Sequence, residues 1–371
     1  MFLLLFHTII LVVACSGIYI EEEKQLRHFI RKKCPMHSLI RTVENYNDTL
    51  KMNLDFVAFR LLGIENYDQR ISMIAEVDHV WHCFCCRWDN IDRWKHIQVI
   101  SYHPNGVYKP SVVQLNNAES ITAIDKLGRH IKVDLFRDGT MKWTPLGLFI
   151  SNCNVRYRQF PFDTQTCQLI FEPWNAIQFV EIENISVSLA DDSYFLDDND
   201  VWYLEKISSS LTTIHYEDNT GYDYSHAVFT LKLSRRPFSY TLTIFLPSVD
   251  LMLLQVSCFL IPPDHPDRSN FSITVLLASA VLQSIINQDI PSSSELILIV
   301  VYLSGQVLIG LVCTIYSVIM CRICYIPPNK FLVSKKPWVP YLDFFVFSVC
   351  LSLVIALHLI TLSLMLKKDP D

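Results

Sequence analysis

The stretch that decides the fold reads Cys153-Asn154-Val155-Arg156-Tyr157-Arg158-Gln159-Phe160-Pro161-Phe162-Asp163-Thr164-Gln165-Thr166-Cys167. Thirteen residues lie between the two cysteines, and an aromatic-proline-aromatic sequence followed by an acid stands near the centre. Proline fixes its own backbone angle, so aromatic rings on either side of it form a rigid apolar tip. A plain surface hairpin would not need such a tip. We therefore expect this segment to rest against an apolar part of the molecule.

The composition indicates where that apolar part lies. The chain has 371 residues, of which 51% are hydrophobic and 18% charged, which is more apolar than a soluble globular protein normally is. Beyond Pro237 there are four apolar stretches, at about 240–261, 271–286, 296–320 and 341–366. Three of them are long enough to cross a bilayer core of about 30 Å. We expect a membrane domain over residues 237–366.

The second stretch is shorter and is rich in polar side chains, so it should be surrounded by the other helices or by water. Within it, residues recur at spacings of 4, 3, 4, 3 and 4, which places them on one face of a helix: Asn270, Thr274, Leu277, Val281, Ser284 and Gln288. This pattern predicts the lining of a pore in which apolar rings gate by dewetting. The alternative is a packed helix interface of small polar residues.

Charges in the connections set the expected topology. All charged residues of the third connection, 321–337, are basic. The second connection carries the acids Asp289 and Glu295 and no basic residue. By the positive-inside rule the third connection is cytoplasmic and the second is outside. The tail, 367–371, is then extracellular. We expect a multi-pass protein of the plasma membrane.

The N-terminal part should be a secreted-side domain. Residues 1–16 combine a short apolar run with small residues typical of a signal peptide; the alternative is a fifth membrane helix. Residues 17–236 then hold six cysteines, an even set suited to disulfides, and two glycosylation acceptors at Asn47 and Asn184. Short alternating runs broken by turns predict an antiparallel β-sandwich, with one short helix near 21–33.

Several function classes find no support in the sequence. Gly-rich phosphate loops, Gly-x-Ser-x-Gly and His-Glu-x-x-His sequences do not occur, so no enzyme motif is present and no cofactor is expected. A membrane enzyme would need paired intramembrane acids or histidines, and only the separate Asp250 and His358 stand out within the spans. The net charge of −6 without a basic run argues against nucleic acid.

The pattern Cys153 to Cys167, followed by four spans, resembles the signature of the Cys-loop receptors, which are pentameric ligand-gated ion channels. The resemblance covers about 44–366 and implies a β-sandwich extracellular domain, a four-helix transmembrane bundle and assembly with four further subunits. It implies a disulfide between Cys153 and Cys167. It also gives the loop tip, Phe160, Pro161, Phe162 and Asp163, a role in coupling ligand binding to the pore through the connection 289–294.

The resemblance extends to a ligand site that contacts the neighbouring subunit. Trp174, Tyr216 and Tyr224 match the family's principal aromatic residues, while Trp81 and Trp143 match the facing side. Such a box attracts an organic cation through the faces of its rings. The alternative for each residue is a place in the core. The sequence Tyr108-Lys109-Pro110-Ser111 and the lack of a cysteine pair near Tyr224 depart from the acetylcholine-binding pattern.

Asp267, beside Arg268, resembles the acid that begins the pore helix in cation-selective members. Five such carboxylates would attract monovalent cations, although Asp267 can instead serve only as a helix N-cap. The pattern is similar to the serotonin type 3 and zinc-activated branch. The expected function is a cation channel opened by a small extracellular ligand, such as an amine, zinc or protons. The alternative is a non-conducting accessory subunit in hetero-pentamers.

Four cysteines have no counterpart in this resemblance. Cys83, Cys85 and Cys86 lie close together in sequence next to His82, and Cys34 lies further toward the N-terminus. In a strand Cys83 and Cys85 share one face. The cluster is interpreted as extra disulfides or, as the alternative, as a zinc site.

Overall fold

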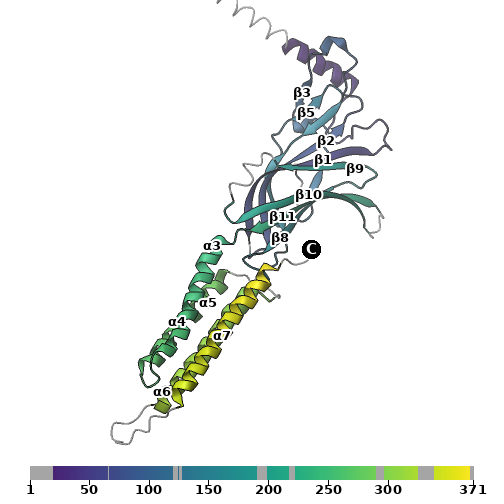
Figure 1. Ribbon diagram of the computed structural model, residues 1–371. Coiled ribbons are helices and arrows are strands. Elements are labelled where there is room, and N and C mark those ends of the chain that lie inside the picture. Colours follow the sequence, from purple (N-terminus) through teal and green to yellow (C-terminus); the bar gives the residue numbers. More distant parts are fainter. Residues whose placement is uncertain are drawn as a thin grey trace, which may run out of the picture.

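The computed structural model describes residues 20–65, 67–119, 124, 128–189, 199–216, 222–289, 296–324 and 338–367. The expected signal peptide, 1–16, lies outside these residues, as do most of the third connection and the end of the tail. The molecule is elongated, with two β-sheets toward one end and a bundle of long helices at the other (Figure 1). Residues 20–33 form a helix close to the predicted one, and it buries Leu26 and Ile30 against the sheets.

The β domain contains a seven-stranded sheet in the order β3-β5-β6-β2-β1-β9, with β7 also pairing with β2. Its strands are β1 (Leu50–Glu65), β2 (Arg70–His82), β3 (Val99–Tyr102), β5 (Val133–Phe136), β6 (Thr140–Trp143), β7 (Leu146–Asn152) and β9 (Val180–Leu189). A four-stranded sheet has the order β10-β11-β8-β4. Its strands are β4 (Val112–Gln114), β8 (Thr164–Pro173), β10 (Trp202–His215) and β11 (Asp223–Arg235). Short 3-10 turns occur at η1 (Asp92–Trp94) and η2 (Pro104–Gly106).

Alternating side chains hold the two sheets together. Along β1, every second residue from Leu50 to Ala58 is buried, as a half-buried strand requires. Phe56 of β1 stacks on Phe229 of β11 with ring centroids 4.9 Å apart, and it meets Phe171 of β8 at 6.1 Å. Aromatic side chains therefore lie between the sheets, and the predicted sandwich is confirmed. It is not wholly antiparallel, because β9 pairs with β1 in parallel.

Among the described residues, four helices are long and apolar enough to cross a membrane. The first, Phe238–Leu260, is built from α3 (Phe238–Tyr240), a π-turn η4 (Thr241–Phe245), α4 (Leu246–Ser257) and a 3-10 turn η5 (Cys258–Leu260). The others are α5 (Asp267–Asp289), α6 (Leu298–Cys324) and α7 (Val339–Leu366). The second helix has 23 residues and is longer than its apolar stretch, because polar residues at both of its ends are also helical.

The signature loop lies where the two domains meet. The ring of Phe160 is 5.0 Å from that of Tyr240 and nearly perpendicular to it, while Phe162 approaches Phe245 at 6.4 Å. The amide of Leu298 at the start of α6 donates to the carbonyl of Arg158 at 3.0 Å. The apolar tip thus rests on the first and third spans, as the aromatic-proline-aromatic sequence predicts.

Candidate functional site

The base of the signature loop is closed by a disulfide between Cys153 and Cys167, whose Cα atoms are 5.0 Å apart. Cys153 follows β7 and Cys167 lies on β8, so the bond joins the two sheets. The structure therefore contains the pairing that the family resemblance implies. Most of the connection 289–294, which was expected to receive the loop tip, lies outside the described residues.

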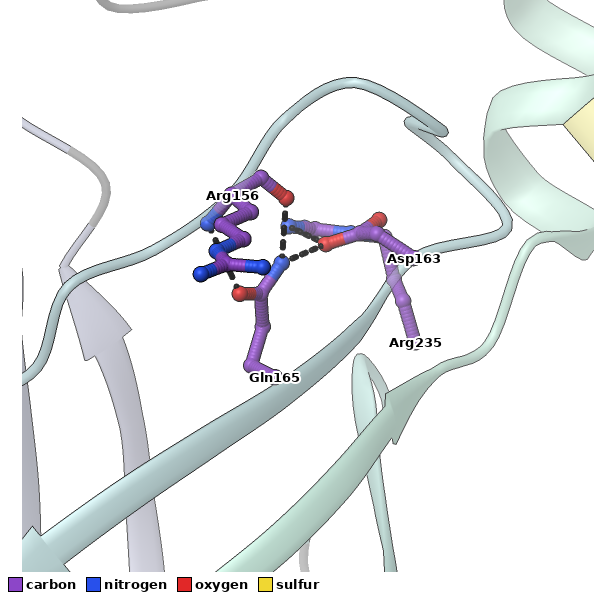
Figure 2. Close-up of polar contacts among 4 residues, drawn as sticks. All are labelled: Arg156, Asp163, Gln165 and Arg235. Atoms are coloured by element: carbon purple, nitrogen blue, oxygen red, sulfur yellow. Dashed lines mark hydrogen bonds and ion pairs between the residues drawn. The ribbon is translucent and has the colours of Figure 1, made fainter. Parts of the chain in front are cut away.

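Asp163 at the loop tip forms a buried ion pair with Arg235, the last residue of β11 (Figure 2). Arg235 Nε donates to Asp163 Oδ1 at 2.7 Å and Nη2 donates to Oδ2 at 3.1 Å, a two-pronged geometry. Gln165 donates to the same carboxylate and exchanges hydrogen bonds with the backbone of Arg156. The guanidinium also lies 4.2 Å from the ring of Trp202.

This network connects the loop to the chain that enters the membrane. Arg235 lies three residues before the start of the first span, and its guanidinium lies 4.9 Å from the Phe160 ring and 5.6 Å from the Tyr240 ring. Asp163, Phe160 and Arg235 therefore form one packed unit with the start of the first span. Asp163 precedes β8 and Arg235 ends β11, so a displacement of the four-stranded sheet must move this unit or break the ion pair.

The aromatic residues of the candidate ligand site come from neighbouring strands of the four-stranded sheet. Trp174 directly follows β8 and is 67% exposed, although its backbone amide is held by the carbonyl of Ser111 at 2.8 Å. Tyr216 follows β10 and Tyr224 lies on β11, and their rings are 5.4 Å apart and nearly perpendicular. The exposed indole of Trp174, whose backbone is fixed by a hydrogen bond, can present its ring face to a cation, as can the rings of Tyr216 and Tyr224.

Beneath the tyrosines lies a buried pair that the sequence interpretation missed. His226 Nε2 contacts Glu172 Oε2, and the hydroxyl of Tyr216 lies 3.3 Å from both groups. Burial beside the Glu172 carboxylate raises the pKa of the Tyr216 hydroxyl, which therefore remains a hydrogen-bond donor. A signal was available, because Glu172 stands two residues before Trp174 and His226 two after Tyr224, and period-two spacing in strands places such residues on one face.

Trp81 and Trp143 were expected on the facing side of the site, and their placement corrects this expectation. Trp81 is 2% exposed and Trp143 is 1% exposed, so both indoles belong to the interior of the subunit and have no free face for a ligand. The Nζ of Lys109 lies 4.2 Å from the centre of the Trp143 ring. The Lys109 side chain thus contacts the ring of Trp143, which was predicted to contact a cationic ligand.

The cysteine cluster is joined into two disulfides in the structure, Cys34 to Cys85 and Cys83 to Cys86. All four sulfur atoms lie within 4.8 Å of one another. This pairing agrees with the disulfide alternative, and it ties the end of the N-terminal helix to the end of β2. The two glycosylation acceptors, Asn47 and Asn184, are exposed.

The predicted pore face of α5 is exposed along its whole length in the single subunit. All six members are exposed, and Leu277 and Val281 are 64% and 51% exposed. Other polar side chains of this helix face its neighbours instead. Ser272 bonds to Gln255 and Thr314, both at 2.7 Å, and Gln283 donates to Ser304 at 2.8 Å. Polar residues of α5 thus divide into an inward set with partners and an outward stripe.

Two adjacent charges at the start of α5 also separate. Arg268 is fully buried and donates to both oxygens of Asp343 on α7, at 3.0 and 2.7 Å. Asp267 has a side chain that is 72% exposed, with His265 Nδ1 at 3.3 Å. The arginine is therefore neutralised inside the bundle, while the neighbouring carboxylate lies at the end of the exposed stripe.

Comparison with known proteins agrees with this architecture. Residues 22–237 match the neurotransmitter-gated ion-channel ligand binding domain, and residues 244–340 match the neurotransmitter-gated ion-channel transmembrane region. The chain belongs to the neurotransmitter-gated ion-channel family. Its N-terminal part is the family's extracellular ligand-binding domain, and the members of this family are ligand-gated ion channels rather than enzymes. The alternative of a membrane enzyme is thereby excluded.

Individual relatives in this family are acetylcholine receptor subunits. The mouse neuronal acetylcholine receptor subunit alpha-6 is 27% identical over 320 residues, which are 86% of this chain and 63% of that protein. The neuronal subunit alpha-4 of Mustela putorius furo is 27% identical over 69% of the chain and 40% of its own length. The beta-type subunit unc-29 of Caenorhabditis elegans is 25% identical over 85% of the chain and 62% of its own length. The chain therefore matches less than two thirds of the length of these relatives.

Proposed function

We propose that the chain is a subunit of a pentameric, cation-selective channel that a small cationic ligand opens from the extracellular side. The observation that carries this proposal is the continuous exposed stripe on α5, which ends at an exposed acid. A membrane helix with exposed Asn270, Thr274, Ser284 and Gln288 is costly in lipid, because polar groups there lack partners. Five copies around an axis would give these side chains water.

Cation selectivity is supported by the charge balance at the start of α5. Asp267 is exposed, and Arg268 is withdrawn into the bundle against Asp343. Five carboxylates around a narrow mouth concentrate cations and repel anions. Without them, the partial positive charges of the helix N-termini would favour anions. By the charge bias of the connections, this mouth is cytoplasmic, both termini are extracellular and the protein resides in the plasma membrane.

The ligand site is supported by Trp174, Tyr216 and Tyr224, which lie at the same end of three neighbouring strands of the four-stranded sheet. The relatives are acetylcholine receptor subunits, which makes acetylcholine the first probe. The finer assignment to the serotonin type 3 and zinc-activated branch rests on sequence pattern only, so serotonin, other amines, zinc and protons complete the panel. A non-conducting accessory subunit is the second candidate, favoured by Lys109 over the Trp143 ring in place of a ligand.

Expression of the chain alone in oocytes tests the proposal. We expect a current with one member of the panel, carried by monovalent cations. Trp174→Ala should raise the activating concentration by about tenfold, equivalent to about 1.4 kcal/mol, which is within the range of a desolvated cation–π contact. The matched control is Trp338→Ala, which removes an exposed tryptophan at the start of α7, far from the site. Surface protein without current, restored by co-expressed acetylcholine receptor subunits, would support the accessory role instead.

A further inference from the structure

The Glu172–His226 pair lies directly across two paired strands. Ala227 of β11 is opposite Phe171 of β8 in the antiparallel register, so the next positions along, His226 and Glu172, are also opposite each other. Phe171 and Ala227 point into the core. Glu172 and His226 therefore occupy the other face of the sheet, the face of the aromatic residues.

The pair is nevertheless buried. The side chains of His226 and Glu172 are 7% and 9% exposed. A carboxylate taken out of water needs a partner, and here its Oε2 accepts from His226 Nε2 and from the Tyr216 hydroxyl. Tyr216 is 39% exposed, so its ring reaches the surface while its hydroxyl is held from below. The pair thereby fixes the angle at which Tyr216 meets Tyr224.

We propose that Glu172 and His226 are positioning residues that orient Tyr216 and set the charge of the ligand site, so that protonation of the pair weakens the binding of a cation. This inference rests on the proposed function and adds a regulation to the same site. With a neutral imidazole the pair carries one negative charge beneath the aromatic rings. When the imidazole gains a proton the pair is neutral, and a ligand cation loses that attraction.

The direction of the effect follows from linkage. A cationic ligand binds more tightly to the form of the site that lacks the extra proton. By linkage, protonation lowers the affinity for the ligand by the same factor by which the bound ligand lowers the affinity for the proton. Histidine is the side chain that ordinarily changes charge between pH 5 and 8. A unit charge about 7 Å from a ligand cation, at an effective dielectric constant between about 35 and 80, corresponds to roughly tenfold to threefold in affinity.

Other titratable groups lie around the Glu172–His226 pair. Tyr224 lies on the same strand as His226, and β4 contributes no titratable residue. Further out, His215 Nδ1 contacts Asp223 Oδ1 at 2.7 Å at the end of the β10–β11 hairpin, and both side chains are about half exposed. His215 is the neighbour of Tyr216 in sequence. It therefore provides a matched histidine, which contacts Asp223 rather than Glu172.

The experiment measures acetylcholine binding and activation for the full-length chain from about pH 8 to about pH 5.5. Acetylcholine carries a quaternary nitrogen, so its own charge does not change with pH. We expect the wild type to lose roughly threefold to tenfold in apparent affinity as the pH falls. His226→Gln keeps a donor for Glu172 and should abolish this dependence, whereas His215→Gln should retain it.

Two further variants separate positioning from folding. Glu172→Gln preserves an acceptor for the Tyr216 hydroxyl but removes the negative charge, so the affinity for acetylcholine should be reduced at high pH. Tyr216→Phe removes only the hydroxyl that the pair holds and keeps the charge of the pair, so it should reduce affinity but retain the pH dependence. A wild type that binds equally at both ends of the range, or a pH dependence that follows His215, would overturn the inference alone. A wild type that binds no member of the ligand panel would refute the proposed function and the inference with it.

Discussion

The ion pair between Asp163 and Arg235 allows a quantitative test of how the two domains are held together. Asp163→Ala leaves the Arg235 guanidinium, whose side chain is 1% exposed, without its carboxylate. Breaking a buried pair by removing one partner costs about 3–5 kcal/mol, because the remaining charge is desolvated. The contacts of Arg235 with the Trp202 ring at 4.2 Å and the Phe160 ring at 4.9 Å are present in both proteins, so they do not offset this cost. We expect a loss of about 3–5 kcal/mol in the free energy of unfolding.

Thermal unfolding in detergent, together with the amount of protein at the cell surface, measures this loss of stability. Asp163→Asn should lose less than Asp163→Ala, because the amide oxygen still accepts from the guanidinium. Glu183→Ala is the matched control: it removes a carboxylate from Lys51 at 2.8 Å, but both side chains are about half exposed, so little change is expected.

The same variant tests the coupling role of the loop. If Asp163 only stabilises the subunit, Asp163→Ala channels that reach the surface should open with unchanged ligand sensitivity. If the unit of Phe160, Asp163 and Arg235 transmits the ligand's effect, the activating concentration should shift even in those channels. An Asp163→Ala protein as stable as Glu183→Ala, with wild-type activation, would refute both the energetic and the coupling argument.

Three further predictions follow from the membrane domain and the disulfide. Asp267→Ala should move the reversal potential toward that of chloride when external sodium chloride is diluted, whereas Asp264→Ala, an exposed acid in the preceding connection, should not. Asp343→Leu should strongly reduce folded protein because it leaves Arg268 unpaired, and the additional change Arg268→Met should restore it, since an apolar pair replaces a buried ion pair without loss. Replacing both Cys153 and Cys167 by serine should cost about 3 kcal/mol of stability, measured by thermal unfolding, with mass mapping of the wild type confirming the bond.

The buried and exposed faces of helices and strands could be predicted from the sequence, because the geometry of each element repeats every few residues. The 3.6-residue repeat on α5 predicted a stripe of six residues, and all six are exposed in the single subunit, as are Ile273 and Ile285 beside them. The lining of a pore by this stripe stays a prediction. A two-residue repeat along β2 likewise applies to Trp81. Ile71, Met73, Ala75 and Val77 alternate along β2 and are buried, and Trp81 continues that alternation inward. Its burial was therefore predictable from its own strand.

Partners that are distant in sequence could not be predicted in this way. Asp163 and Arg235 are 72 residues apart, and Glu172 and His226 are 54 residues apart. Their contacts depend on the register between β8 and β11, and a shift by one residue would turn each side chain to the other face of the sheet. Register is a property of the folded sheet. For that reason the aromatic residues of the site were identified from pattern, whereas the buried pair that orients one of them was not.

The charge at the mouth of the proposed pore depends on the same kind of distant contact. Asp267 and Arg268 are adjacent, and their charges would cancel if both side chains faced one space. Successive side chains on a helix point about 100° apart, so one can face outward while the next faces a neighbouring helix. The choice is made by Asp343 on α7, 75 residues away, which holds the arginine inside the bundle. It follows that α7 takes part in the proposed charge filter without lining it, because its acid removes the cation that would otherwise offset Asp267.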